Sequence, residues 1–244
     1  MKKKIAIYGD IHGNLEAFKT VLSKLKGETI DYTLITGDIV GYYPHPTECI
    51  DLIRNLKKFI VISGNHDRAV TLKEADWNKR IHWFNDIAQE ALTYCRAKLQ
   101  LPENKEYFEW LSALPVKKTI ELEGWKIYLC HGSPNDPDEY IYKSEAKDRS
   151  KKWFGKFGDI ILLGHTHLPF TIRTKQGNLV INPGSVGQPR DGDNRAAYSI
   201  LTLNPSGKPQ VKNYRVKYNI EKTNSYVKAE RLPLSLGNRL YKGL

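Results

Sequence analysis

The segment IAIYGDIHGN, residues 5–14, decides the fold of this chain. Its first five residues form an apolar run that predicts a short β-strand. The strand passes directly into the polar motif Asp10-Ile11-His12, and a helix with Asn14 as its N-cap is expected to follow. The segment therefore predicts a strand that delivers a carboxylate and an imidazole to its carboxyl end.

Four further polar motifs follow predicted strands in the same way. They are Gly37-Asp38, Gly64-Asn65-His66-Asp67, His131-Gly132 and Gly164-His165-Thr166-His167. Together, the five motifs hold five of the seven histidines of the chain, three aspartates and one asparagine. In open α/β sheets, ligands bind beyond the carboxyl ends of the strands. The five motifs are therefore expected to converge on one site.

The order of apolar runs and helical periods predicts the fold class. Residues 5–63 alternate strand and helix, and this βαβαβ order implies a parallel sheet covered by helices. The second half of the chain is rich in strands joined by short turns. The predicted strands are residues 5–9, 32–36, 59–63, 116–122, 125–130, 160–163, 170–173, 179–181, 197–203 and 211–216. We expect an α/β fold, a four-layer αββα sandwich of two mixed β-sheets flanked by helices.

We expect residues 1–244 to form a single domain, because the sequence contains no internal repeat, low-complexity stretch or clear linker. A helical insertion is predicted at about 71–114, where the strand pattern stops. A C-terminal helical segment is predicted at about 219–244, with its clearest helical period between residues 222 and 231.

The insertion shows its own local signals. Thr71 and Glu74 have the spacing of a capping box. One long helix is expected to run from there through Trp83 until Pro102 breaks it. We expect the aromatic residues of the insertion, and His82, to have packing roles.

Composition limits the cellular setting. Hydrophobic residues make up 40% of the chain, and no apolar run approaches the ~20 residues that a membrane helix needs. The lysines at positions 2–4 precede too few apolar residues for a signal peptide. The three cysteines, Cys49, Cys95 and Cys130, are an odd number without metal-ligand or redox spacing. We therefore expect a cytoplasmic protein with no membrane association.

The net charge of +11 arises from 38 lysines and arginines against 27 acidic residues. A basic surface attracts anionic partners and speeds their arrival. The sequence contains no recognisable nucleic-acid module, so we interpret most of this charge as a solvated, lysine-rich surface. The expected partner is a small phosphorylated molecule, and a homo-oligomer is left open.

The residue types in the five motifs point to metal chemistry. Any one motif alone has an ordinary explanation, such as a turn, a loop cap or a buried histidine. As an ordered set after strands, they supply imidazole and carboxylate ligands, which suit first-row ions such as Mn, Fe or Zn better than Ca²⁺. Because none of the candidate ligands is a cysteine, a structural zinc site is not expected.

The series Asp-x-His, Gly-Asp, Gly-Asn-His-Asp, His and Gly-His-x-His resembles the calcineurin-like metallophosphoesterases. The resemblance covers nearly the whole chain, including the segments DIHGN, residues 10–14, and NPGSVGQPR, residues 182–190. Both segments are similar to the compact bacterial and archaeal phosphodiesterase branch of that family. Every ligand type that the family requires is present.

The resemblance implies two divalent metal ions, which could be Mn, Fe, Zn, Ni or Co. One ion would be bound by Asp10, His12 and His167, and the other by Asn65, His131 and His165. Asp38 would bridge the two ions. A hydroxide that bridges the ions would then attack phosphorus without a covalent enzyme intermediate.

The resemblance also implies roles for residues that do not bind metal. His66 would contact the phosphate and protonate the leaving group, and Asp67 would orient its imidazole. Asn65 would contact the phosphate as well as a metal ion.

Two more residues are candidate substrate contacts. His45 follows the loop after Asp38 and would contact a phosphate or a base, unless it is an ordinary exposed loop histidine. Arg190 would bind a second phosphate through its planar fork, unless it forms an ion pair with Asp191 or Asp193.

The leading hypothesis is a metal-dependent phosphodiesterase or phosphomonoesterase that acts on a small, nucleotide-type substrate. A sharper version is a hydrolase of dinucleoside polyphosphates such as diadenosine tetraphosphate. Alternatives within the enzyme class are a protein phosphatase and a nuclease. A non-catalytic scaffold, similar to a retromer subunit of this fold, would be expected to have lost ligands, whereas this chain retains them all.

Overall fold

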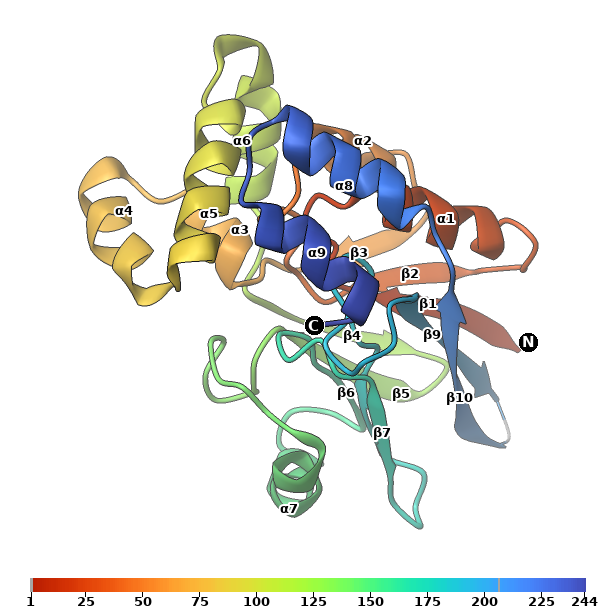
Figure 1. The fold of residues 1–244 in the computed structure, drawn as a ribbon. Coiled ribbons are helices and arrows are strands. Elements are labelled where there is room, and N and C mark those ends of the chain that lie inside the picture. The colour runs from red at the N-terminus through yellow and green to blue at the C-terminus, as the bar shows by residue number, and fades with distance from the viewer. Residues whose placement is uncertain (1, 206) are drawn as a thin grey trace.

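The computed structural model describes residues 2–205 and 207–244 (Figure 1). Two mixed five-stranded sheets pack face to face, as the sequence predicts. The first sheet has the order β10-β9-β1-β2-β3, and the second has the order β4-β5-β6-β8-β7. The first contains β1 (Lys3–Tyr8), β2 (Tyr32–Ile35), β3 (Phe59–Val61), β9 (Ala196–Asn204) and β10 (Gly207–Val216). The second contains β4 (Lys117–Leu122), β5 (Trp125–Cys130), β6 (Ile160–Leu162), β7 (Phe170–Arg173) and β8 (Leu179–Asn182).

Strand direction explains why the site motifs share one edge. In the first sheet, β1, β2 and β3 are parallel, so their carboxyl ends lie together. In the second sheet, β5, β6 and β8 are parallel, and only the edge strands β4 and β7 run antiparallel to them. The loops that follow β1, β2, β3, β5 and β6 carry the five motifs.

The apolar runs are continuous because the central strands are buried on both faces. In β1, Ile5 and Ile7 face the second sheet, while Ala6 and Tyr8 face the helices. The layer between the sheets is filled by branched aliphatic residues from both of them. This alternation fixes the register of the strand, because a shift of one residue would exchange the two faces.

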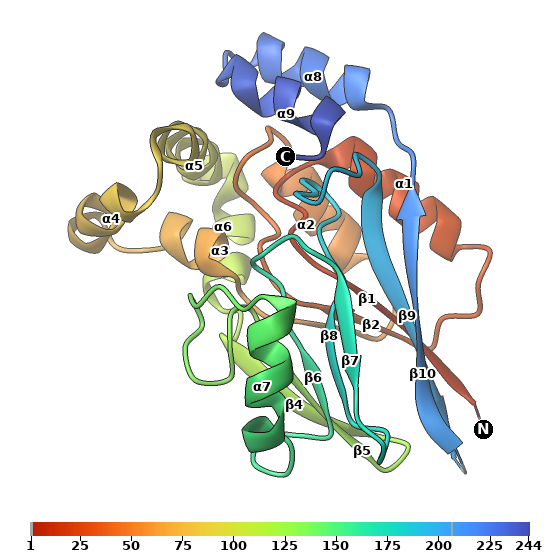
Figure 2. The same cartoon turned by 60° about the horizontal axis from the view of Figure 1, so that its bottom comes forward.

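Helices cover both outer faces, which gives the predicted four layers (Figure 2). On the first sheet lie α1 (Leu15–Leu25) and α2 (Pro46–Arg54), and α8 (Ile220–Ala229) packs beside α1. α9 (Leu234–Lys242) packs antiparallel to α8 at the end of the described chain. On the second sheet lies α7 (Lys143–Trp153), whose Trp153 is buried against it. Neither α7 nor the division of the C-terminal segment into α8 and α9 was predicted from the sequence.

The helical insertion is present but differs in detail from the prediction. It contains α3 (Asn65–Val70), α4 (Glu74–Arg80), the 3₁₀ turn η1 (Ile81–Trp83), α5 (Asp86–Leu99), the 3₁₀ turn η2 (Pro102–Asn104) and α6 (Lys105–Ser112). The predicted long helix is wrong, because Asn85 starts a new helix by accepting a hydrogen bond from the amide of Ala88 at 3.0 Å. The predicted capping box is wrong as well, because the Thr71 hydroxyl donates to the carbonyl of Asp67, at the end of α3.

Other predictions concern the chain as a whole. In the parts of the chain that the structure describes, no helix is long and apolar enough to cross a membrane. The three cysteines are free and buried. The single-domain division stays a prediction.

Candidate metal centre

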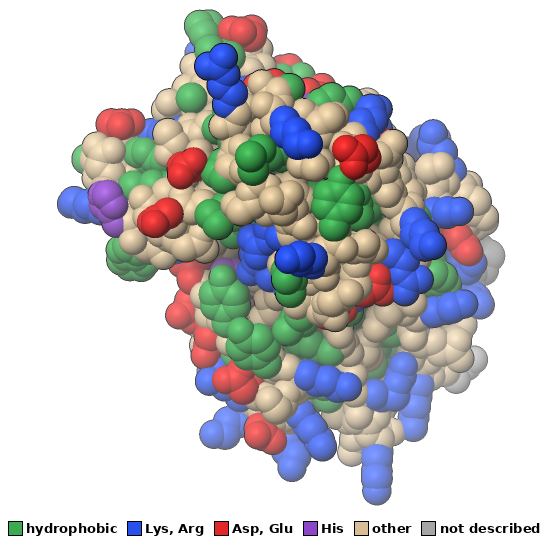
Figure 3. All heavy atoms as spheres, in the orientation of Figure 1, with side chains coloured by type: hydrophobic (Ala, Val, Ile, Leu, Met, Phe, Trp, Pro, Cys, Tyr) green, Lys and Arg blue, Asp and Glu red, His purple; other side chains and the backbone are tan. Residues whose placement is uncertain are grey.

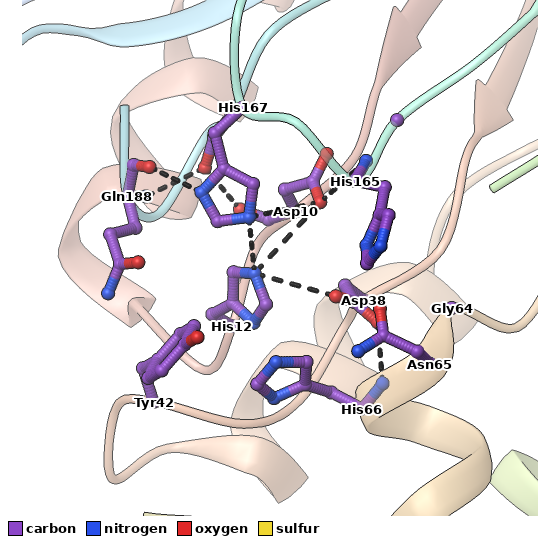
Figure 4. Close-up of polar contacts among 12 residues, drawn as sticks. Asp10, His12, Asp38, Tyr42, Gly64, Asn65, His66, His165, His167 and Gln188 are labelled. Atoms are coloured by element: carbon purple, nitrogen blue, oxygen red, sulfur yellow. Dashed lines mark hydrogen bonds and ion pairs between the residues drawn. The ribbon is translucent and has the colours of Figure 1, made fainter. Parts of the chain in front are cut away.

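All seven predicted ligands meet at the edge formed by the carboxyl ends of the strands (Figure 4). None is more than 7% exposed, although each carries a polar side chain. We call Asp10, His12 and His167 the first half of the centre, and Asn65, His131 and His165 the second half. Asp38 lies between the halves.

The first half brings three ligand atoms close together. The Nε2 atoms of His12 and His167 are 3.0 Å apart, and Asp10 Oδ1 lies 3.3 Å from His167 Nε2. Asp38 Oδ2 lies 3.6 Å from His12 Nε2. This half therefore offers two carboxylates and two imidazoles to one point.

The second half is built in the same way on the other side of Asp38. His131 Nε2 lies 3.3 Å from Asp38 Oδ2 and 3.1 Å from Asn65 Oδ1. A ring nitrogen of His165 joins the same cluster of Asp38 and His131 atoms. The same Asp38 oxygen thus faces one histidine of each half, as a bridging ligand would.

The backbone at this edge is unusual. Five of the seven ligands have positive φ angles: Asp10 (49°), His12 (52°), Asp38 (52°), His165 (67°) and His167 (61°). Non-glycine residues rarely adopt this left-handed conformation, and it persists only where the surrounding structure enforces it. Such strain concentrated at one site is typical of functional sites.

Each ligand histidine has one ring nitrogen held by a main-chain carbonyl. The partners of the Nδ1 atoms of His12, His131 and His167 are the carbonyls of Val40 (3.3 Å), Thr36 (2.8 Å) and Gln188 (2.6 Å). The partner of His165 Nε2 is the carbonyl of Asp138, at 3.0 Å. A carbonyl can only accept, so the nitrogen that faces it carries the proton. The opposite nitrogen of each ring then presents a lone pair to the centre, as metal-ligating histidines do.

The resulting donor set fits divalent cations. The lone pairs of His12 and His167 face each other at 3.0 Å, and those of His131, Asp38 and Asn65 also converge. The buried Asp10 Oδ2 has no hydrogen-bond partner among the described residues. Converging acceptors without donors are unfavourable unless a cation lies between them. Imidazole and carboxylate ligands suit first-row ions.

The electrostatics of the bare side chains agree with this interpretation. Burial, opposed by the charge of His131 and aided by that of Asp38, raises the pKa of Asp10 to about 6. Burial opposes the protonation of His131, but the Asp38 carboxylate outweighs it and raises the pKa of His131 to about 9. Without a metal ion, His131 would therefore hold a proton at neutral pH, and binding of a cation would release it.

His66 lies beside the ligands but differs from them. Its ring centre is 4.7 Å from that of His12 and 4.7 Å from that of Tyr42. The Phe84 ring lies edge-on to it, with 5.2 Å between ring centres. No main-chain carbonyl holds its Nδ1, which has no hydrogen-bond partner among the described residues. A side chain at Gly41, where φ is +139°, would come within 2.5 Å of this atom.

The predicted role of Asp67 is wrong. Its carboxylate accepts hydrogen bonds from the amides of Ile39 (2.9 Å), Val40 (3.1 Å) and Gly64 (2.9 Å), rather than from the His66 ring. Asp67 thereby ties the loop after β2 to the start of α3. Because three main-chain donors occupy its oxygens, it positions the backbone around Asp38 and does not orient the imidazole.

Asp138 is a site residue that the sequence analysis missed. Its carbonyl holds His165, and its carboxylate forms ion pairs with Arg68 of α3 and with Arg80 of α4, the latter at 2.6 Å. The Tyr140 ring lies tilted against the His165 ring, with 3.8 Å between ring centres. The insertion thus fastens the loop that orients one ligand of the second half. Only the spatial pairing reveals this role, because Asp138 belongs to no strand-end motif.

Arg190, a predicted substrate contact, lies beside the centre. It donates to Gln188 Oε1 at 2.8 Å and to the Tyr42 hydroxyl at 3.2 Å. The alternative ion pairs do not form, because Asp191 pairs with Arg215 and Asp193 pairs with Arg195. The guanidinium therefore remains available beside the centre.

His45 is not placed as a substrate contact. It is the N-cap residue of α2, and its ring packs against Tyr226 of α8 with 4.5 Å between ring centres. The prediction that it contacts a phosphate or base is not supported, because α8 covers the ring. Nor is it an exposed loop histidine, since its side chain is half-buried, and this burial lowers its pKa.

The chain matches known proteins over almost all of its length. The family model described as "Calcineurin-like phosphoesterase superfamily domain" matches residues 3–206. An uncharacterised protein of Methanocaldococcus jannaschii is 35% identical over 260 residues, covering 100% of this chain and 99% of that protein.

Two solved structures are similar over the same range. A metallophosphoesterase from Sphaerobacter thermophilus is 34% identical, with a TM-score of 0.77 and 99% of both chains covered. A hypothetical protein from Pyrococcus horikoshii is 27% identical, with a TM-score of 0.84, covering 99% of this chain and 98% of that one.

These matches and the clustered ligands define the class of the protein. The chain belongs to the calcineurin-like phosphoesterase superfamily. It is a metal-dependent hydrolase of phosphoric esters, and its buried histidines and aspartates are grouped as divalent metal ions require.

Proposed function

We propose that the protein binds two divalent metal ions and hydrolyses a phosphodiester or phosphomonoester of a small, nucleotide-type substrate. The observation that supports two ions most strongly is the position of Asp38 Oδ2, at 3.6 Å from His12 Nε2 and 3.3 Å from His131 Nε2. One carboxylate oxygen between two sets of imidazole lone pairs is the arrangement that a bridging ligand needs. We assign one ion to each half of the centre.

The ions, when bound, activate water and stabilise the charge that develops on the phosphoryl oxygens. The side chains of the protein then determine how the substrate lies. Asn65, at the start of α3, offers its amide to a phosphate oxygen as well as to the second half. Arg190 offers two-pronged hydrogen bonding to an anionic group from the Tyr42 side.

We propose that His66 donates the proton that the leaving oxygen needs. It is 4% exposed, and its ring is not held by a carbonyl in the way that the four ligand histidines are. Burial lowers the pKa of its imidazole to about 4 in the bare protein, and a bound phosphate would favour the protonated form. General acids of this kind contribute about 10²–10⁴-fold to the rate.

The sharper substrate hypothesis is a dinucleoside polyphosphate such as diadenosine tetraphosphate. It is supported by the guanidinium of Arg190, which has no carboxylate partner among the described residues and suits a substrate with more than one phosphate. A protein phosphatase and a nuclease remain alternatives that the same assays address.

The test is the hydrolysis of bis-(p-nitrophenyl) phosphate and p-nitrophenyl phosphate, with Mn²⁺ and with a chelator. Metal-dependent turnover of the diester would support a phosphodiesterase and lead to nucleotide substrates, with diadenosine tetraphosphate first. Turnover of the monoester alone would make it a phosphomonoesterase. The Asp38→Asn variant is the matched negative control. If the protein binds metal but cleaves neither ester, this result would favour the alternative of a non-catalytic scaffold.

We also propose a cytoplasmic setting, supported by three free, buried cysteines. A homo-oligomer is a further proposal, supported by exposed apolar side chains on the insertion and α9, Trp83 and Tyr241 among them. Light scattering of the purified protein tests the second point.

A further inference from the structure

Two arginines flank one tyrosine beside the candidate metal centre. The guanidinium carbon of Arg190 lies 5.8 Å from the centre of the Tyr42 ring, and that of Arg239 lies 5.9 Å from the same point. The Tyr42 ring centre is itself 4.7 Å from the ring centres of His12 and His66. Both cationic groups are therefore close to the place where a phosphate would bind.

Neither arginine is paired with an acidic side chain in residues 2–205 and 207–244. Arg190 donates only to neutral oxygens, those of Gln188 and Tyr42. Arg239 uses its Nε on the main-chain oxygen of Leu244 at 2.5 Å, and its two terminal nitrogens have no partner among the described residues. These nitrogens are available to an anion.

Neighbouring arginines behave differently. Arg195 forms a 2.6 Å ion pair with Asp193, and Arg215 pairs with Asp191. The two acidic residues that follow Arg190 in sequence therefore pair with other arginines. The contrast shows that carboxylates are available in this loop but are directed away from Arg190.

The two guanidiniums also repel each other. Both are partly buried, and burial together with the charge of Arg190 lowers the pKa of Arg239. Holding two like charges near one ring in a partly buried place is unfavourable unless an anion offsets them. The arrangement is thus of the kind that favours anion binding.

Hydrogen bonds hold α9 against the segments that line the site. Three of them join Tyr43 Oη to the Leu236 carbonyl (3.3 Å), Gly192 N to the Gly243 carbonyl (3.0 Å) and Asn194 Nδ2 to the Tyr241 carbonyl (3.1 Å). Two of the three attach to the loop that follows Arg190. The position of Arg239 relative to Arg190 is therefore fixed by the fold and not left to a free surface side chain.

The arginine that α9 contributes lies in the C-terminal part of the chain, beyond the range of the family model. The family model ends at residue 206, so Arg239 lies outside the matched range. In Figure 3, lysine and arginine side chains lie in the middle of the face next to hydrophobic ones, and more of them line its right and lower edges.

We propose that Arg190 and Arg239 form a subsite for a second phosphate group of the substrate, next to the phosphate that is held at the metal centre. Two guanidiniums can each bind a phosphate through two parallel N–H···O bonds. The inference rests on the proposed function, since it assumes that the first phosphate lies at the centre. Such a subsite would select substrates with a diphosphate or longer phosphate chain over simple monoesters.

The test is isothermal calorimetry with inorganic pyrophosphate and inorganic phosphate, on the metal-loaded protein with metal in fixed excess over both ligands. Chelation is then the same for every variant. We expect the wild type to bind pyrophosphate at least about tenfold more tightly than phosphate, and Arg239→Gln to lose about tenfold of that preference. Arg239→Lys, which keeps the charge but not the fork, should lose less.

Lys242→Gln is the matched control, because it removes one positive charge from an exposed position of the same helix. An equal loss in Lys242→Gln and Arg239→Gln would overturn the subsite, and so would a wild type without any preference. The readout does not require turnover. A protein that shows the preference but hydrolyses no ester would support the subsite and contradict the proposed function.

Discussion

The two halves of the candidate metal centre share Asp38 but differ in charge and in support. The first half has a carboxylate of its own, Asp10, and its histidines are held by carbonyls of Val40 and Gln188, which are buried parts of the sandwich edge. The second half has only the neutral amide of Asn65. One of its histidines is held by the carbonyl of Asp138, in a loop that the insertion fastens.

The difference suggests that the two halves bind their metal ions by different means. A second carboxylate binds an ion by charge, whereas a neutral amide contributes less, so the second half depends more on accurate positioning. Through Arg68 and Arg80, the helical insertion fastens the loop that holds His165, which is a ligand of this half. We therefore expect the second half to be the weaker and more adjustable one.

The largest effect should come from the residue that both halves share. Asp38→Asn removes one charge from both halves, and we expect activity to fall by about three orders of magnitude, since metal ions supply several kcal/mol of transition-state stabilisation. Elemental analysis should show less metal in both halves. Full metal content with full activity would contradict the bridging assignment.

His66 belongs to neither half, so its loss should separate chemistry from metal binding. We expect His66→Gln to keep the wild-type metal content and to reduce turnover by about 10²–10⁴-fold. The reduction should be greatest for esters with poor leaving groups, which need the proton most. Steady-state kinetics on alkyl and aryl esters measures this, and an equal loss on both would exclude the acid role.

Weakening the contact between the insertion and the Asp138 loop should lower metal affinity in the second half alone. Arg80→Met removes one of the two ion pairs that hold the Asp138 carboxylate, and we expect the affinity for one of the two ions to fall by about tenfold, within the range for residues that support ligands. Metal titration followed by calorimetry resolves the two ions. Lys79→Met, at an exposed neighbouring position of α4, is the control. A loss at both ions would show that the halves are not independent.

An ion pair outside both halves should give the smallest effect. The hydrogen bonds from Arg195 lower the pKa of Asp193 to about 2, below the unfolded value of about 3.9. Its contribution to stability is therefore present above about pH 4 and is lost as the pH falls through about 2. Because the pair is partly exposed, we expect Asp193→Asn to cost less than about 1 kcal/mol at pH 7. Thermal melts of both proteins should converge as the pH is lowered from about 4 to about 2.

Much of the fold was predictable because the apolar runs are long, branched and each ends in a polar motif. β5 and β7 have the predicted bounds, and the seven ligands meet because parallel strands bring their carboxyl ends together. The helix α7 was missed, since its mean hydropathy is low and only three of its residues, Trp153 among them, are buried.

The supporting residues could not be predicted from local pattern. Asp138 acts through a main-chain carbonyl, which any residue type possesses, and Arg239 reaches the site from the far end of the chain. Asp67 was assigned to the wrong partner because its neighbour in sequence is an imidazole. In the fold, the amides of Ile39, Val40 and Gly64 satisfy its carboxylate better.

The left-handed backbone of Asp10, His12, Asp38, His165 and His167 determines how these ligands should be tested. Among residues with a side chain, aspartate, asparagine and histidine tolerate this conformation best. An alanine would therefore remove a ligand and also raise the conformational energy of the loop, so alanine scanning would confuse two causes of inactivity. Asparagine in place of aspartate keeps both shape and conformation. Comparison of the two substitutions at a single position would measure the conformational cost apart from the charge.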